Sequence, residues 1–448
     1  MSYCQNYILV AALGLSIYGV REVSRLKGDD EKRTQLIFEL VILHLSFTTL
    51  ALILYFLSIP YILTGVDTQK LALAGGILIF SSVFSIEWLF AGMGDFKFIA
   101  VRSIGVRIAF FSSMLLLVRS PKDYDIYLFL LITQVVVSGV LNTYYGRRYI
   151  RGRFVISIRG IKSHISPLLI LGAYSVLTSI YAVLPNSFLG VMSSSEAVGY
   201  FSSSDKLVRV FISIFSALSI VMVQRLNSVW HVSSKSEGYG LLVCQSLEIV
   251  VGVAIPISAF VFLFSDSIVL VAAGHDFEPA ISCLRIMAPI IVCVAIAQIS
   301  CIQILSVHKH DKTLVGLAFV GMVISVAINM LYIPSYSFKA AAYAQLFSES
   351  IVSLISVFYA IKVYPLKIKR SRVLAAVFIS LGFYFVHHFV SSLLSNEILV
   401  LIFGASMCSI LFLFSHLFLL RDSLLRALVR PYFVAWNMGK LRAFIRYR

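Results

Sequence analysis

The chain contains 448 residues, of which 59% are hydrophobic and only 13% are charged, and its formal net charge is +16. In a soluble protein this positive charge would favour nucleic-acid binding, but the mean hydropathy of +0.94 is typical of a chain that lies largely within a lipid bilayer. These values exclude an ordinary soluble domain and, with it, a nucleic-acid partner.

Apolar segments long enough to cross a membrane recur along the whole sequence. A hydrocarbon core of roughly 30 Å needs about twenty apolar residues in a helix. We therefore expect an all-α, polytopic membrane protein with about 13 transmembrane helices. In chain order, the predicted segments are residues 4–20, 35–58, 69–91, 98–118, 123–145, 166–190, 198–224, 239–264, 277–305, 312–333, 338–361, 373–393 and 398–420.

Lys and Arg residues occupy alternate gaps between these segments. The gaps after segments one, three, five, seven, nine and eleven, together with the C-terminal tail, hold 27 of the 37 Lys and Arg residues. The other six gaps hold two, Arg119 and Lys122. Because loops rich in Lys and Arg stay in the cytoplasm, we expect the N-terminus outside and the C-terminus in the cytoplasm.

The cysteine and loop patterns argue against an enzyme or a metal site. The six cysteines fall inside apolar segments without CxxC or Cys/His ligand spacing, as expected for small apolar side chains. No gap exceeds about twenty residues, which is too short for a catalytic loop domain, and GxxxxGKS/T, GxSxG and HExxH motifs are absent. The sequence predicts a channel or a transporter, not an enzyme, with no cofactor and no metal.

Of the cations inside predicted segments, where an ionisable group costs roughly 2.5 to 3.5 kcal/mol unless it faces a cavity or a partner, four are candidate site residues. They are Arg107, Lys206, Arg209 and Arg285. We interpret them as lining an aqueous cavity that receives an anionic substrate. The alternatives are that Lys206 and Arg209 extend toward lipid headgroups, and that Arg285 forms a structural ion pair with Glu278.

Acidic and amide side chains occur at similar depth. Glu248 and Glu349 lie near the middle of segments eight and eleven, with Gln298 and Asn329 in segments nine and ten. We expect Glu248 or Glu349 to couple transport to a proton or a cation, and Asn329 and Gln298 to be polar groups of the cavity. The alternative is that both glutamates are protonated and hydrogen-bonded between helices.

Two amphipathic segments are predicted to lie along the membrane surface instead of spanning it. One follows segment five and the other forms the C-terminal tail. The predicted organisation is an N-lobe at residues 1–148, a cytoplasmic interfacial linker at 149–165, a C-lobe at 166–364, an additional helix pair at 365–420 and a basic cytoplasmic tail at 421–448.

Four short motifs resemble one family of membrane transporters. Residues 87–97 (EWLFAGMGDFK) and 118–124 (VRSPKDY) resemble the W-x-F/Y-x-G-x-x-D/E-x-K and V-K/R-x-x-x-D-Y patterns of polysaccharide transporters. Residues 17–23 (IYGVREV) and 196–207 (EAVGYFSSSDKL) are similar to that family's Y-G-x-R-E turn and E-x-V-G-Y-Y-x-x-A-x-K-L segment. The chain thus resembles the O-antigen and capsule flippases of the multidrug/oligosaccharidyl-lipid/polysaccharide exporter superfamily.

This resemblance implies a two-lobed exporter fold with two six-helix bundles around a central cavity. The family usually has twelve or fourteen helices, whereas residues 2–7 match the entry to its second helix. We therefore expect a 14-helix fold in which helix 1 is absent from this sequence, through a misassigned start or a degraded gene.

The resemblance also implies a substrate and a location. The substrate would be an undecaprenyl-diphosphate-linked oligosaccharide, such as an O-antigen repeat unit, which alternating access moves from the cytoplasmic to the outer leaflet of the bacterial inner membrane. Arg107, Lys206, Arg209 and Arg285 would bind the diphosphate. The expected partners are this lipid, membrane lipids, a proton or sodium counter-ion, and other membrane proteins of polysaccharide assembly.

Two other functions remain open at this point. A multidrug or metabolite cation antiporter of the same superfamily would share the fold, and transport of a fluorescent organic cation would favour it. A non-transporting membrane scaffold for glycan assembly would tolerate substitution of its buried charges but not loss of its cytoplasmic loops.

Overall fold

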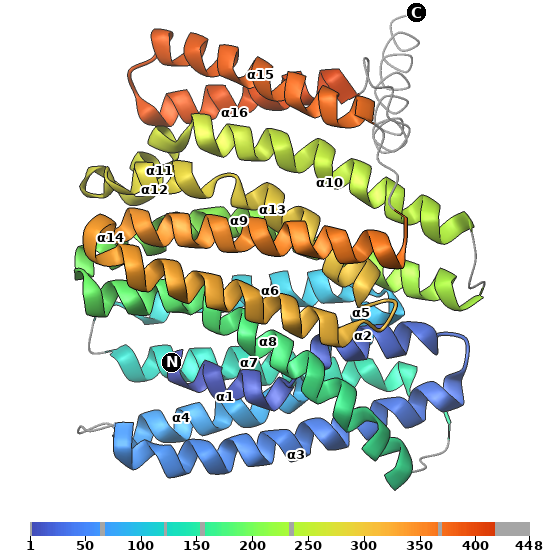
Figure 1. Cartoon of the computed structure of the whole chain (residues 1–448). Helices are drawn as coiled ribbons and strands as arrows, with labels where there is room; N and C mark the ends of the chain where they lie inside the picture. Colours follow the sequence, from blue (N-terminus) through green and yellow to red (C-terminus); the bar gives the residue numbers. More distant parts are fainter. Residues whose placement is uncertain are drawn as a thin grey trace, which may run out of the picture.

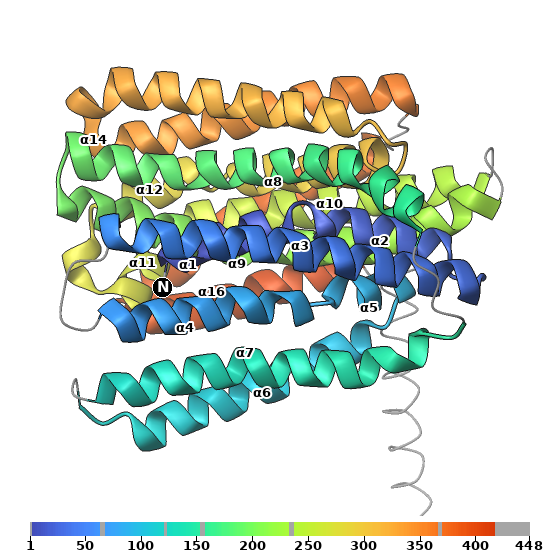
Figure 2. The ribbon, with the colours of Figure 1, turned by 90° about the horizontal axis from the view of Figure 1, so that it is seen from below.

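A computed structural model describes residues 2–62, 68–120, 123–152, 157–232, 237–365 and 370–416. In these ranges all regular secondary structure is helical, and the long helices run roughly parallel to one another (Figures 1 and 2). The prediction of an all-α polytopic membrane protein is confirmed. The predicted tail at 421–448 lies outside the described residues, as do residues 153–156 of the predicted linker.

The first part of the chain forms a group of helices that we call the N-lobe, residues 2–152. Its first predicted segment consists of two helices that meet at Gly14, whose left-handed φ of 70° suits a residue without a Cβ atom. The elements are α1 (Ser2–Ala12), α2 (Leu15–Arg25), α3 (Asp30–Ile62), α4 (Thr68–Ser81), η1 (Ser82–Phe84), α5 (Glu87–Met93), α6 (Phe96–Leu117), α7 (Tyr124–Gly146) and η3 (Arg147–Tyr149).

The second part, residues 157–365, is the C-lobe, and a helix pair follows it. Helix α8 begins at Ile158, so the second half of the predicted linker at 149–165 is already helical. The elements are α8 (Ile158–Met192), α9 (Ser195–Val232), α10 (Glu237–Leu263), α11 (Ser265–Ala273), η4 (His275–Phe277), α12 (Ala280–Met287), α13 (Ile290–Ala297), η5 (Gln298–Leu305) and α14 (Asp311–Val363), then α15 (Arg370–Leu393) and α16 (Glu397–Phe414).

Twelve helical stretches in the described residues are long and apolar enough to cross a membrane. One of them, α14, has 53 residues, and its backbone is non-helical at Ser337. Figure 1 shows the chain doubling back within α14, so this stretch corresponds to two predicted segments, 312–333 and 338–361. The thirteen predicted segments therefore all have helical counterparts.

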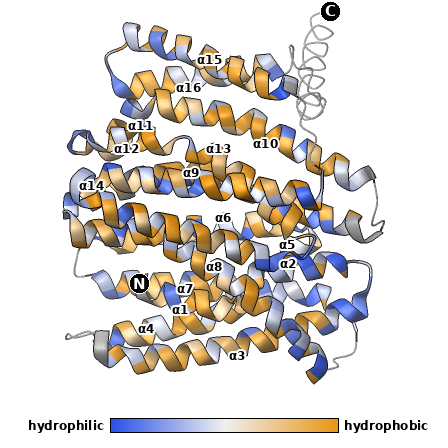
Figure 3. Ribbon diagram, in the orientation of Figure 1, coloured by the Kyte–Doolittle hydropathy of each residue, from blue (hydrophilic) through white to orange (hydrophobic). Residues whose placement is uncertain are grey.

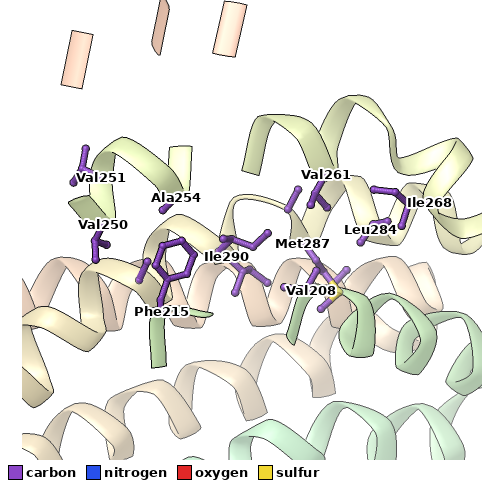
Figure 4. Close-up of a cluster of buried hydrophobic side chains, with 14 of the residues drawn as sticks. Val208, Phe215, Val250, Val251, Ala254, Val261, Ile268, Leu284, Met287 and Ile290 are labelled. Atoms are coloured by element: carbon purple, nitrogen blue, oxygen red, sulfur yellow. The ribbon is translucent and has the colours of Figure 1, made fainter. Parts of the chain in front are cut away.

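The largest apolar core lies in the C-lobe. There, α9, α10, α12 and α13 pack around side chains such as Phe215, Val250, Met287 and Ile290, all at most 2% exposed (Figure 4). Helix α15 packs against α10 on the side away from the N-lobe. Hydrophobic residues run along the helices, whereas hydrophilic residues gather near the ends of many of them (Figure 3).

One end of the bundle carries the Lys- and Arg-rich turns, and we call it the basic end. Helix α2 ends there at Arg25, η3 contains Arg147 and Arg148, and α14 begins there at Asp311. In Figure 1 this end lies on the right. The turns before α7 and α9 and the reversal at Ser337 lie at the opposite end.

Candidate functional site

A cavity of about 710 Å³ lies between the two lobes. Helices α2, α5 and the start of α6 form one wall, and α8, α9 and η5 form the other. Hydroxyl groups supply much of its polar surface, notably Ser16, Ser175, Thr178 and Ser216. Among the described residues that line it, Glu87 is the one charged side chain. The sequence predicted a central cavity lined by cations, and this chamber does not contain the four predicted cations.

Gln298 is the predicted site residue that does line this cavity. Its side-chain nitrogen donates to the Ser216 hydroxyl at 3.3 Å, and it also borders a smaller cavity of about 90 Å³. It begins η5, a π-helical turn in which Ser306 N–H donates to the Cys301 carbonyl at 2.9 Å. Short π-helical turns inside α-helices are frequent at functional sites. They change the direction in which the following side chains point.

Glu349 forms a wall of the smaller cavity and is 9% exposed. Tyr181 of α8 donates its hydroxyl to Glu349 Oε1 at 2.9 Å, and the charge of Arg209 on α9 attracts this carboxylate. Three helices of the C-lobe therefore meet at Glu349. The structure brings together two predicted residues, Arg209 and Glu349, that lie 140 positions apart in the sequence.

Arg209 is not a free cation, because Asp205 pairs with it. Arg209 Nε lies 2.6 Å from Asp205 Oδ2, and Gln345 of α14 donates to Asp205 Oδ1 at 3.2 Å. The sequence analysis missed Asp205, although its spacing of four residues from Arg209 on one helix is the usual spacing of an ion pair. Lys206 is exposed on the same helix and lines none of the cavities described above.

A third hollow, of about 280 Å³, lies within the N-lobe between η1, α6 and α7. The exposed Arg107 lines it, together with Gln134 and the buried Arg102. Arg102 donates to Asn142 Oδ1 and to Glu87 Oε1. Since Glu87 lines both this hollow and the cavity between the lobes, the two spaces share a wall.

The sequence analysis did not identify Arg102, Glu87 or Asn142 as site residues. Glu87 and Arg102 lie in the stretch that carries the family resemblance, but no spacing rule places two residues of different helices in contact. The exposed terminal group of Arg107 has room to contact a ligand, whereas Arg102 is only 8% exposed and is held by its neighbours.

The remaining predicted residues lie away from these cavities. Arg285 pairs with Asp266 and donates from Nε to the Ser265 hydroxyl at 2.8 Å, so its ion-pair partner is Asp266 where the sequence suggested Glu278. Glu248 of α10 lies 3.7 Å from Arg372 Nε of α15, which directs it toward the additional helix pair.

Asn329 is fully buried in the first half of α14. Its side-chain nitrogen donates to the Ser325 carbonyl at 2.7 Å, one turn earlier on the same helix. None of the cavities described above includes Asn329 among its lining residues. The prediction that it is a polar group of the cavity therefore lacks support from these contacts.

The amino-terminal half of the chain matches a known protein family. Residues 4–223 match the family model described as "Polysaccharide biosynthesis protein". A protein from Escherichia coli (strain K12) described as "Putative O-antigen transporter" is 20% identical over 227 residues, which are 50% of this chain and 54% of that protein. This chain thus spans about half the length of the curated relative that it matches.

Several solved structures share the fold over most of their length. A crystal structure of MATE in complex with MaL6 has a TM-score of 0.68 at 15% identity and covers 83% of this chain and 86% of its own. A transporter of the MOP superfamily from Pyrococcus furiosus has a TM-score of 0.61 at 14% identity, with coverage of 83% and 86%.

The lipid II flippase MurJ in an inward closed conformation has a TM-score of 0.59 at 13% identity and covers 94% of this chain and 93% of its own. At such low identity these likenesses show the fold alone, which is the exporter fold that the motifs predicted. This chain is therefore a multi-pass membrane protein with this fold, and its residues 4–223 match the polysaccharide biosynthesis protein family.

Proposed function

We propose that this chain is a flippase for an undecaprenyl-diphosphate-linked oligosaccharide, such as an O-antigen or another surface polysaccharide repeat unit. The observation that carries the proposal is the cavity of about 710 Å³ between the lobes, at the place where alternating access requires a binding site. The family match, and the relative described as an O-antigen transporter, point to the same substrate class.

The chemistry of the cavity walls suits a glycan headgroup. Serine and threonine hydroxyls and the Gln298 amide can both donate to and accept from sugar hydroxyls. Trp88 and Tyr174 add aromatic faces. The lipid chain can stay in the bilayer while the headgroup crosses, so the cavity needs to accommodate only the polar end of the substrate.

The diphosphate requires cationic partners. Arg107 is the best placed of the predicted cations, since it is exposed in the hollow that shares Glu87 with the central cavity. Arg209 comes second because Asp205 already neutralises much of its charge. Arg209, Lys206 and Arg285 line none of these cavities, and we assign no contact with the substrate to Lys206 and Arg285.

Coupling to a proton or sodium gradient is assigned to Glu349. It borders the 90 Å³ cavity that shares Gln298 with the central chamber. Glu248 is a weaker candidate because it is paired with Arg372. By the positive-inside rule, the basic end and the C-terminus face the cytoplasm of a bacterial inner membrane.

Reconstitution tests this function. The purified chain would be placed in liposomes with an undecaprenyl-diphosphate oligosaccharide that carries a fluorophore on its sugar, and dithionite would bleach the outer leaflet. We expect bleaching to continue beyond the outer-leaflet fraction in vesicles with the chain and to stop there in vesicles without it. Identical final bleaching in both would contradict the proposal.

One observation favours a second candidate, an antiporter for organic cations. The single charged residue among the described lining of the central cavity is an acid, Glu87, and Trp88 next to it offers an aromatic face for a cation. The same liposomes distinguish the two candidates. Uptake of a fluorescent organic cation that is abolished by Glu87→Gln, without any movement of the glycolipid, would select the antiporter.

A further inference from the structure

A chain of hydrogen bonds joins the two lobes near the basic end. The Tyr18 hydroxyl of α2 lies 2.6 Å from His164 Nδ1 of α8, and His164 Nε2 lies 3.0 Å from Glu39 Oε2 of α3. Gln35 donates to the other carboxylate oxygen of Glu39 at 2.9 Å. Tyr18 and Glu39 belong to the N-lobe, whereas His164 belongs to the C-lobe, so this imidazole is held between two groups of the opposite lobe.

The carboxylate in this chain is almost completely withdrawn from solvent. Glu39 is 4% exposed and Tyr18 is 5% exposed. Gly160, in the first turn of α8, leaves room for the carboxylate, because a Cβ atom there would lie only 2.2 Å from Glu39 Oε1. Burying a charge without a partner is costly, so the groups around Glu39 determine whether this contact is stable.

The nearby charged groups are already paired with one another. Arg21 of α2 pairs with Asp311 of α14 and with Glu22, and Arg25 pairs with Glu22 at 2.9 Å. Arg21 and Arg25 act on the Tyr18 hydroxyl electrostatically, as do Glu22 and Asp311. On α8 itself, Arg159 and Lys162 are exposed. Among the described groups, His164 is the ion-pair partner of Glu39.

The proton on His164 decides the charge of this contact. A neutral imidazole donates from Nε2 to Glu39 and accepts the Tyr18 hydroxyl at Nδ1, which leaves one net negative charge buried. A protonated imidazole donates from both nitrogens, Tyr18 becomes the acceptor, and the pair with Glu39 has no net charge. Histidine is the side chain whose ordinary titration falls in the physiological range.

We propose that Glu39 and His164 form a proton-binding site that controls opening of the lobes at the basic end. A bound proton stabilises the closed contact, and its release leaves a buried, unbalanced carboxylate that becomes hydrated when the lobes separate. The stability of the closed contact is therefore present at low pH and is lost as pH rises. Its role in a transport cycle rests on the proposed function, but the proton-controlled opening does not.

Accessibility of the central cavity from the basic end measures this opening. Ser16 lines the cavity, so Ser16→Cys in an otherwise cysteine-free full-length chain gives a reporter for an impermeant maleimide added on that side. Gly28→Cys is the matched control, because Gly28 lies in the exposed turn at the same end with no atom within 4 Å of an added Cβ. The labelling rate of Ser16→Cys is divided by that of Gly28→Cys, and this labelling ratio corrects for the pH dependence of the thiol reaction itself.

We expect the labelling ratio to rise severalfold between pH 6 and pH 8 in the otherwise unaltered protein. His164→Gln can still bond to both neighbours but cannot take up a proton, so its ratio should stay high at both pH values. Glu39→Gln removes the buried charge, so its ratio should not rise with pH. Tyr18→Phe keeps the acid and the imidazole and should keep a pH dependence.

A ratio that is constant with pH in the unaltered protein would overturn the proposal, and so would a pH-dependent ratio that survives in His164→Gln. No substrate is present in this experiment. Glycolipid transfer with a constant ratio would therefore reject the proton site alone, whereas a pH-dependent ratio without any glycolipid transfer would reject the proposed function alone.

Discussion

Arg21 of α2 and Asp311 of α14 form a buried bidentate ion pair across the lobe interface, although they are 290 residues apart in the sequence. Nη1 lies 2.7 Å from Oδ1 and Nη2 lies 3.0 Å from Oδ2, and Arg21 is only 2% exposed. Arg21 also donates to the Ser306 carbonyl, and Arg25 donates to the Val307 carbonyl. The turn before α14 is thereby attached to the end of α2.

Removal of one partner of this pair should destabilise the protein strongly. Asp311→Asn leaves the Arg21 charge buried, which typically costs about 3–5 kcal/mol, and because Glu22 still contacts Arg21 Nε at 3.2 Å we expect the lower end of that range. Thermal unfolding in detergent measures the effect. Lys32→Ala, which breaks the exposed pair with Asp29 at the same end, should leave the unfolding temperature unchanged.

The exchange Arg21→Asp with Asp311→Arg keeps an ion pair at this place but swaps its two partners. It therefore tests whether the attraction alone is sufficient, or whether each side chain must stay in its own position. If the attraction between the lobes is what matters, the double variant should recover part of the stability that each single variant loses. A double variant no more stable than the less stable of the two single variants would show that the bond from Arg21 to the Ser306 carbonyl matters more than the ion pair.

Arg107 and Arg285 should respond differently to substitution. Arg107 is exposed in its hollow and has no described ion-pair partner, so Arg107→Ala should lower glycolipid transfer at least tenfold while the unfolding temperature stays constant. Arg285→Ala breaks a half-exposed pair with Asp266 and should lower stability by no more than about 1 kcal/mol without affecting transfer. The reverse pattern would assign the substrate contact to Arg285.

Glu349 and Glu248 make a similar comparison for ion coupling. Glu349→Gln keeps a group that can accept the Tyr181 hydroxyl but cannot exchange a proton, so transfer should become independent of an imposed pH or sodium gradient. Glu248→Gln weakens the attraction to Arg372 and should stay dependent on the gradient. Gradient dependence that survives in Glu349→Gln and disappears in Glu248→Gln would reverse the assignment.

Apolar length predicted the helices well because a bilayer forces each crossing to satisfy its own backbone hydrogen bonds. The same argument predicted the break inside α14, where the chain reverses at Ser337. It could not predict which polar side chains meet. Glu87 and Arg102 come from different helices, and so do Tyr181 and Glu349, and these contacts depend on how each helix is rotated.

Depth along a helix was also a poor guide to exposure within the bundle. Glu248 and Glu349 lie at similar predicted depth, yet one faces the additional helix pair and the other borders a cavity. The contact of Tyr18, His164 and Glu39 was missed because His164 falls in the segment predicted to be an interfacial linker. In the structure, α8 begins at Ile158 and carries this histidine into the lobe interface.

The close approach of Gly14 and Gly172 predicts how tightly the lobes must pack at their centre. A Cβ atom on Gly14 would lie 2.6 Å from the backbone nitrogen of Gly172 on α8, and the φ of 70° already disfavours other residues. Gly14→Ala should cost about 1–2 kcal/mol for the backbone conformation and a further 1–3 kcal/mol for the overlap. Because the overlapping atoms belong to the backbone, relief requires that α8 move away.

Two glycine variants separate these contributions. Gly274→Ala has no atom within 4 Å of the added Cβ, so it reports the strain of a positive φ without any overlap; its φ of 87° and ψ of 174° are even less accessible to Ala than the conformation of Gly14. Gly316→Ala lies inside α14 with equally open space and should stabilise the protein by up to about 1 kcal/mol. If Gly14→Ala separates the lobes, it should also raise the labelling of Ser16→Cys, whereas Gly274→Ala should not. Equal labelling in both variants would show that the Gly14 contact with α8 does not hold the lobes together.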